Sequence, residues 1–312
     1  MKRDTTHLIT NQEEASNFLR GAIVWRGSVT PRIMPMLLLL CLYPLGLVAL
    51  DHYWQPLPTL DVTPFEYTGV VLGMVLVFRT NAGYDRWGEA RKSWGGIISH
   101  SRNLIIGALQ YGPSDPVWRE AFVKWTIVFS FATKESLRSS HNFVNLTDML
   151  SKQELEELSS ALHMPLFVAS KIAALLQNTR SNYQNTNGAV LDSFESTILE
   201  GQRILLVDAM GACERILRTP MPLVYAVKTR RFIFMFLLLL PFSLLERSGF
   251  YTIGIFFLVA YPLLSLDRIG IELQKPFDKK SLSHLPLDAL CETIKLQGLN
   301  LWEHDKCPKT NA

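Results

Sequence analysis

Three apolar side chains at a four-residue spacing are the first residues in this chain whose pattern suggests a function. Val70, Met74 and Phe78 occupy positions i, i+4 and i+8 of the stretch FEYTGVVLGMVLVFRTNAGYDRWGEARKSW. On a helix this spacing places them on one narrow stripe. If several copies of the chain surround an axis, each residue forms an apolar ring, which narrows a pore and gates it by dewetting. The alternative is that the stripe packs against another helix of the same subunit.

Arg79 directly follows the stripe, at the end of an uncharged run that starts at Tyr67. An arginine at the edge of a membrane segment is a functional candidate by default. It would add positive potential to a pore vestibule if it faced the lumen, as part of a polar, basic continuation of the helix. Because it lies one residue off the stripe, it could instead form a structural ion pair with an acid of a neighbouring helix. The sequence leaves both alternatives open.

Motifs for enzyme chemistry are absent from the sequence. It contains no P-loop, no dinucleotide-binding glycine motif, no zinc-protease helix and no nucleophile elbow. The seven histidines are scattered, and the four cysteines form no C-x-x-C pair. We therefore expect a protein that is not an enzyme, with no catalytic residues, no cofactor and no metal site. The net charge of +3 gives no argument for a nucleic-acid partner.

Four apolar segments suggest membrane helices: 33–50, 67–78, 232–245 and 250–266. The first and fourth approach the roughly 20 residues that span a bilayer. The other two are short, and short segments can cross where their ends face protein or a water-filled cavity. Every second flank of these segments is rich in lysine and arginine. This pattern indicates cytosolic termini and a multi-pass protein of the plasma (inner) membrane. The consistent charge bias disfavours the alternative, buried core helices of a soluble protein.

The region between the second and third apolar segments shows helical periodicity and no strand-like alternation. We expect helices over 116–138, 164–178 and 189–218, and Ser151 with Glu154 resembles a capping box that opens a further helix. The second apolar segment is expected to continue into this all-α region as one long helix. The predicted division is a cytosolic N-terminal segment (1–30), the first and second membrane helices (31–94), a cytosolic helical domain (95–227), the third and fourth membrane helices (228–268) and a cytosolic C-terminal segment (269–312).

Four phrases of the sequence, in order, resemble the bacterial-type branch of the bestrophin family. They are WRGS (25–28), FRTNAGYDRWGEARKSWG (78–95), CERILRTPMPLVY (213–225) and IGIELQKPF…LPLDAL (269–290). The resemblance implies an all-α membrane protein with four transmembrane helices per subunit and a cytosolic helical bundle, assembled as a homopentameric channel. It also implies that the second membrane helix lines the pore and that Val70, Met74 and Phe78 form its hydrophobic neck.

The function implied by this resemblance is passive conduction of small anions such as chloride across the lipid membrane. The positive edge of a phenylalanine ring at Phe78 fits anions. Val70 and Met74 would narrow the pore and exclude water from it, with little preference for the sign of the ion. Some bacterial members prefer cations, so a Na+- or K+-preferring channel is the alternative. A membrane-anchored helical receptor would need no pore stripe, and a secondary transporter would show more spans and internal repeats.

The resemblance implies two further features of the cytosolic part. A second constriction matches Phe194, whose alternative role is a core aromatic of the helical bundle. Animal members bind calcium after the fourth span, where this chain reads KPFDKKSLSHLPLD. Asp278 and Asp288 lie there among three lysines, and calcium needs several closely placed oxygen ligands, so we expect no calcium site.

Overall fold

The structure is a computed structural model that describes residues 24–25, 27–54, 57–181 and 191–306. Every regular element in these residues is a helix, which confirms the all-α prediction. The chain divides into two compact units. The first unit comprises the described residues within Met1–Trp87, Pro220–Pro276 and Lys280–His284, and the second comprises those within Gly88–Thr219, Phe277–Lys279 and Leu285–Ala312.

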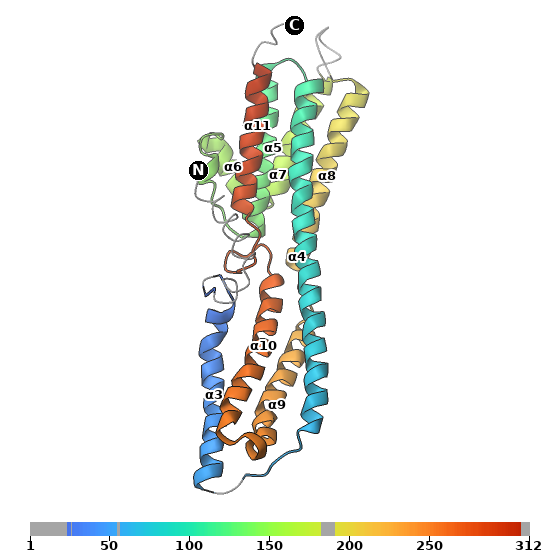
Figure 1. The fold of residues 1–312 in the computed structure, drawn as a ribbon. Coiled ribbons are helices and arrows are strands. Elements are labelled where there is room, and N and C mark those ends of the chain that lie inside the picture. Colours follow the sequence, from blue (N-terminus) through green and yellow to red (C-terminus); the bar gives the residue numbers. More distant parts are fainter. Residues whose placement is uncertain (1–23, 26, 55–56, 182–190, 307–312) are drawn as a thin grey trace. The chain divides into compact units, whose positions relative to one another are not determined.

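The first unit is a group of four helices (Figure 1). They are α3 (Thr30–Tyr53), the first part of α4 (Thr63–Tyr111), α9 (Leu223–Ser248) and α10 (Thr252–Leu273). The short 3-10 turn η3 (Gly249–Tyr251) joins α9 to α10, and Gly249 there has a positive φ of 48° that favours glycine. All four helices contribute to one apolar core, which includes Leu37, Leu72, Leu76, Ile233, Phe236, Leu237, Leu240, Phe256 and Ala260.

Two stretches of the described residues are long and apolar enough to cross a membrane. One is α3, and the other is Leu223–Leu273, which contains α9, η3 and α10. They contain the first, third and fourth apolar segments of the sequence. The second segment lies in α4, where the apolar run ends at Arg79 and is shorter than a full span.

Helix α4 runs without interruption through 49 residues. This corresponds to about 73 Å at 1.5 Å per residue, more than twice the thickness of a hydrocarbon core. Its residues up to Trp87 belong to the first unit and those from Gly88 to the second. The long helix predicted across residues 65–94 is therefore present, and it continues as far as Tyr111.

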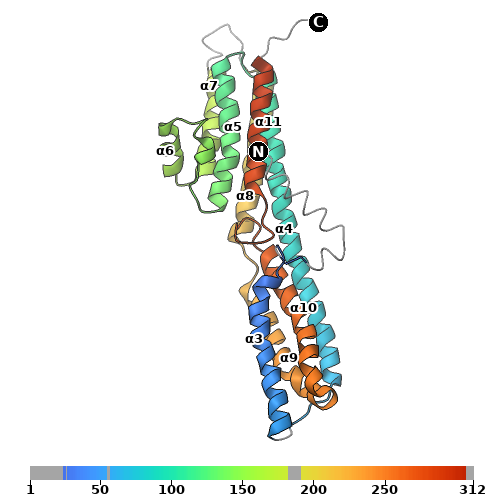
Figure 2. The same cartoon turned by 60° about the vertical axis from the view of Figure 1, so that its left-hand side comes forward.

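The second unit is a helical bundle. Besides the last part of α4 it contains α5 (Pro116–Leu137), α6 (Lys152–Ser160), α7 (Met164–Ser181), α8 (Ser193–Arg218) and α11 (Leu287–Lys306), with the 3-10 turn η1 (Val144–Leu146). Figure 2 shows α5 between α7 and α11, and α5 contacts both. Nearly every side chain of α5 from Phe122 to Glu135 is buried, so α5 is the central helix of this bundle.

Local caps explain where these helices begin. Ser151 accepts a hydrogen bond from the Glu154 amide and the Glu154 carboxylate accepts one from the Ser151 amide, which confirms the predicted capping box. The predicted start of the 189–218 helix is wrong by four residues. Asp192 and Glu195 form a second capping box, so α8 begins at Ser193; residues 189 and 190 lie outside the described residues.

Candidate functional site

The stripe on α4 is exposed in the subunit. Val70, Met74 and Phe78 have exposed fractions of 69%, 57% and 61%, whereas Leu72 and Leu76 on the opposite face have 0%. The structure therefore does not have the stripe packed against another helix of its own subunit. Helix α4 turns one apolar face into the core and a second apolar face outward.

The outward face of α4 changes from apolar to polar immediately after Phe78. Asn81 and Asp85 are exposed, and at 100° per residue they lie within about 80° of arc together with Val70, Met74 and Phe78. The expected basic character of this continuation is wrong in the first unit. Its arginines turn toward α10 instead: Arg86 donates from Nε to the Gln274 carbonyl at 3.1 Å.

Arg79 is almost fully buried, with an exposed fraction of 1%. Its Nη1 pairs with Oδ1 of Asp267 on α10, and Nε of Arg230 on α9 lies 3.3 Å from Oδ2 of the same carboxylate. Of the two alternatives that the sequence leaves open for Arg79, the structure has the ion pair. The position one residue off the stripe is the sequence signal for this inward orientation.

Glycines bring α4 close to α9 and α10. A Cβ added at Gly83 would lie 3.2 Å from Cβ of Leu273 and 3.3 Å from the Gly270 carbonyl oxygen, tighter than ordinary contact. At Gly69 an added Cβ would meet the Phe236 ring at 3.5 Å, whereas nothing lies within 4 Å at Gly73. Helix α4 thus approaches α10 most closely at Gly83, and at Gly69 it is in ordinary contact with α9.

Glu272 is a second organising acid that sequence reasoning missed. Its carboxylate accepts from Nη1 of Arg32 and lies 3.0 Å from Nη2 of Arg268. It also accepts from the Leu282 amide at 2.9 Å, which holds the chain after α10 in place. Arg268 lies four residues before Glu272 on α10, whereas Arg32 and Leu282 lie in other parts of the chain, which spacing within the IGIELQKPF phrase could not reveal.

Phe194 lies in the first turn of α8 and has an exposed fraction of 80%. Its alternative role as a core aromatic of the bundle is therefore wrong. The exposed ring follows the Asp192 cap by two positions, which fixes it at the start of the helix.

Asp288, one of the two acids in the stretch KPFDKKSLSHLPLD, is paired with cationic side chains of the second unit. Asp288 lies 3.0 Å from Nζ of Lys134, 2.7 Å from Nη1 of Arg138 and 3.5 Å from Nζ of Lys279. Burial by itself would raise the pKa of Asp288, but hydrogen bonds from Arg138 and Lys134 outweigh it and hold the pKa below its ordinary value. In the described ranges no group of three or more metal-ligating side chains comes together.

Comparison with known proteins gives a consistent picture. The family model described as "Bacterial/Fungal Bestrophin protein" matches residues 9–299. A voltage-dependent anion channel-forming protein of Nostoc sp. is 33% identical over 282 residues, which cover 89% of this chain and 87% of that protein. The voltage-dependent anion channel-forming protein YneE of Escherichia coli is 30% identical over 294 residues, 94% of each chain. The crystal structure of a bacterial bestrophin homolog from Klebsiella pneumoniae superposes with a TM-score of 0.78 at 25% identity, covering 87% of this chain and 98% of that one.

Proposed function

The chain belongs to the bacterial and fungal bestrophin family, and from this premise we propose that it is a channel that passively conducts small anions such as chloride. Membership makes it a membrane protein of a channel family rather than of an enzyme family. The relatives named as anion channel-forming proteins support the proposed transported species. The proposal assigns no catalytic role to any residue.

The observation that carries the proposal is the continuous outward face of α4. A face of this helix that met only lipid would stay apolar over the bilayer, because ionisable side chains in membrane segments face the bundle interior or a water-filled cavity. Here the exposed face passes from Phe78 directly to Asn81 and Asp85. A water-filled lumen explains both halves of the face: the apolar half as a neck and the polar half as a wetted vestibule.

A single α4 cannot enclose a lumen, so the proposal requires several copies around an axis. The family resemblance implies five, in which Val70, Met74 and Phe78 form three successive apolar rings. Chemical cross-linking of the purified protein in detergent tests this directly. A ladder that ends at five subunits supports the channel, whereas a protein that stays monomeric favours a membrane-anchored helical receptor.

We further propose that four segments of each subunit cross the membrane: α3, the apolar part of α4, α9 and α10. Their arginine- and lysine-rich flanks put both termini in the cytosol. The apolar part of α4 is shorter than a full span, and a water-filled lumen on one side allows such a segment to cross. The exposed ring of Phe194 is proposed as a second, cytosolic constriction in the same assembly.

A cation-preferring channel is the second candidate, and Asp85 is the observation that favours it. A ring of exposed carboxylates is a common feature of cation pores. Arg79, which would oppose it, is buried against Asp267 and does not lie on the outward face. Within the first unit, anion preference would then come from the neck, where the positive edge of the Phe78 ring is one source.

Reversal potentials under asymmetric salt separate the two candidates. The purified protein is reconstituted into a planar bilayer with a KCl gradient. We expect a reversal potential on the side of the chloride equilibrium potential. A reversal potential on the side of the potassium equilibrium potential would establish the cation-preferring channel, and an electrically silent bilayer from correctly assembled protein would contradict both.

A further inference from the structure

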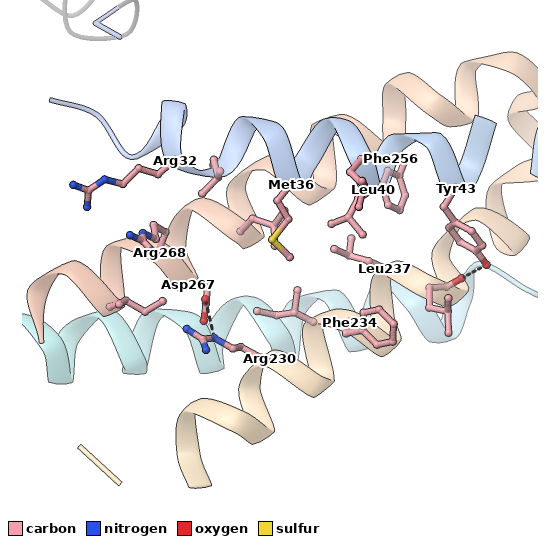
Figure 3. A pocket seen from close by; sticks show the side chains of 16 residues that line it. Arg32, Met36, Leu40, Tyr43, Arg230, Phe234, Leu237, Phe256, Asp267 and Arg268 are labelled. Carbon is pink, nitrogen blue, oxygen red and sulfur yellow. Dashed lines mark hydrogen bonds and ion pairs between the residues drawn. The ribbon is translucent and has the colours of Figure 1, made fainter. Parts of the chain in front are cut away.

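The first unit contains a pocket that the pore does not use. It has a volume of about 690 Å³ and is lined by α3, α9 and α10, within the usual range of about 300–1,000 Å³ for small-molecule sites. Figure 3 shows its two ends: Arg32, Arg230, Asp267 and Arg268 at one, Tyr43 at the other, with apolar side chains between them. The pocket is therefore an apolar slot with charged side chains at one end.

The apolar part of the slot is open along one side. Its floor is formed by buried side chains such as Ile33, Leu237 and Phe256, while Met36 and Phe234 are more than half exposed along its rim. In a membrane protein such a side opens to the hydrocarbon of the bilayer. A flexible hydrocarbon chain can enter it sideways and bury its surface against the floor.

The charged end carries an excess of positive charge. Four guanidinium groups, those of Arg32, Arg79, Arg230 and Arg268, share the two carboxylates of Asp267 and Glu272, which leaves two positive charges uncompensated. Among the described residues no further acid pairs with this cluster. An anion at this end would balance the charges that the protein itself does not.

Two of these arginines keep hydrogen-bond donors for a ligand. Arg230 uses Nε toward Asp267 and is about half exposed, and Arg268 uses Nη2 toward Glu272. Both line the pocket. Their other terminal N–H groups match the oxygens of a phosphate, for which the planar guanidinium fork is well suited.

We propose that this pocket binds an anionic phospholipid of the cytoplasmic leaflet, with its phosphate at Arg230 and Arg268 and one acyl chain in the slot. The charge excess selects an anionic over a zwitterionic headgroup, and the apolar slot selects an acyl chain over a free anion. Anionic lipids are enriched on the side of the membrane where the positive flanks of α3, α9 and α10 place this end. This side assignment rests on the proposed membrane orientation.

The test compares retention of two lipids with identical acyl chains, dioleoyl phosphatidylglycerol and dioleoyl phosphatidylcholine, by the delipidated full-length assembly in native mass spectrometry. We expect preferential retention of phosphatidylglycerol. The double variant Arg230→Gln/Arg268→Gln should lose this preference by about thirtyfold, since each basic side chain near an anionic headgroup contributes about fivefold. The matched control Lys228→Gln/Arg231→Gln removes the same charge from exposed positions of α9 outside the pocket and should keep the preference.

A second pair of variants tests the slot without touching a charge. Met36→Trp fills the rim and should lower phosphatidylglycerol retention, whereas Leu42→Trp, at an exposed position of α3 outside the pocket, should not. Equal retention of the two lipids would overturn the proposal. Equal effects of the pocket and control variants would also overturn it, because they would indicate either that a neighbouring copy covers the slot or that lipid binds over the whole surface. Displacement of phosphatidylglycerol by equimolar inorganic phosphate would also overturn it, in favour of a simple anion site.

The readout is independent of ion flux. An assembly that conducts ions but shows no lipid preference would contradict the lipid site and leave the proposed channel function standing. An assembly that retains phosphatidylglycerol selectively but conducts no ions would contradict the proposed channel function and leave the lipid site standing.

Discussion

Arg79 and Asp267, 188 positions apart in the sequence, form a buried ion pair between α4 and α10. The pair fixes the rotation of α4 about its own axis. With Arg79 held against α10, the preceding residue Phe78 is turned away by about 100° and lies on the exposed face. The register of the proposed neck is thus set by an electrostatic contact behind it, and the inward arginine is a positioning residue for the stripe.

This geometry predicts that Asp267 matters more to stability than Arg79 does. Asp267→Asn leaves the buried guanidinium of Arg79 without its anion and should lower the free energy of unfolding by about 3 kcal/mol. Arg79→Met should cost less, because Asp267 keeps Arg230 as a partner. Thermal unfolding of the purified variants in one detergent measures the difference.

The control for this comparison is Arg231→Gln, an exposed arginine of α9 next to Arg230. It should leave the unfolding midpoint unchanged. If Arg79 faced the lumen, Arg79→Met would change the reversal potential at unchanged stability, a result that would contradict the buried pair.

The proposed neck predicts that Met74→Ala increases conductance several-fold in a planar bilayer. The smaller side chain widens the apolar ring and lowers the barrier to wetting. The matched control is Met235→Ala on α9, since Met235 is exposed to the same degree (59% against 57%) but lies away from the stripe. Equal currents from Met74→Ala and wild type, in protein of equal purity and assembly, would show that Met74 does not form a constriction.

Features that depend on neighbouring residues in the sequence could be predicted. The capping box of Ser151 and Glu154, the long α4 and the stripe of Val70, Met74 and Phe78 all follow from spacing along one helix, and the structure contains each of them. Their physical causes are local: hydrogen bonds to free amides and the 3.6-residue period. The exposed state of the stripe could be stated only as one of two alternatives, because periodicity does not say what a face meets.

Features that join distant segments could not be predicted. Asp267, the partner of Arg79, and Arg32, one partner of Glu272, lie on other helices, and the sequence around each acid carries no marker of these arginines. The polar end of the outward face of α4 was expected to be basic. The structure turns Arg79 and Arg86 inward and leaves Asp85 exposed, since burial of each arginine is offset by a specific acceptor on or after α10.

Asp85 therefore makes its own prediction about selectivity. Asp85→Asn removes a ring of negative charge from the proposed vestibule and should move the reversal potential toward the chloride equilibrium potential in a KCl gradient. Glu156→Gln, an exposed acid on α6, is the charge-matched control. Identical shifts in the two variants would mean that Asp85 acts through the general surface potential and does not line the ion path.

The cluster around Asp288 predicts how stability depends on pH. Lys134 and Arg138 hold the pKa of Asp288 below its ordinary value of about 4 against the opposing effect of burial. A carboxylate whose pKa is lowered by folding stabilises the protein above its unfolded pKa, and this contribution is lost as the pH falls through the folded pKa. Because Asp288 is about half exposed, solvent screening reduces the size of the effect but not its sign.

The expected result is a thermal unfolding midpoint that falls as the pH is lowered below about 5 in the wild type. Asp288→Asn should start from a lower midpoint at pH 7 and fall less steeply, because the variant has no carboxylate to protonate at this position. Part of the slope that remains comes from Glu135, whose pKa is also lowered: burial opposes the shift, and hydrogen bonds from Ser140, the Asn142 amide and Lys134 outweigh it. Glu303→Gln, an exposed acid on the same helix α11, controls for loss of a negative charge. Parallel pH curves for wild type and Asp288→Asn would show that the cluster with Lys134 and Arg138 does not stabilise the folded protein through the ionised carboxylate.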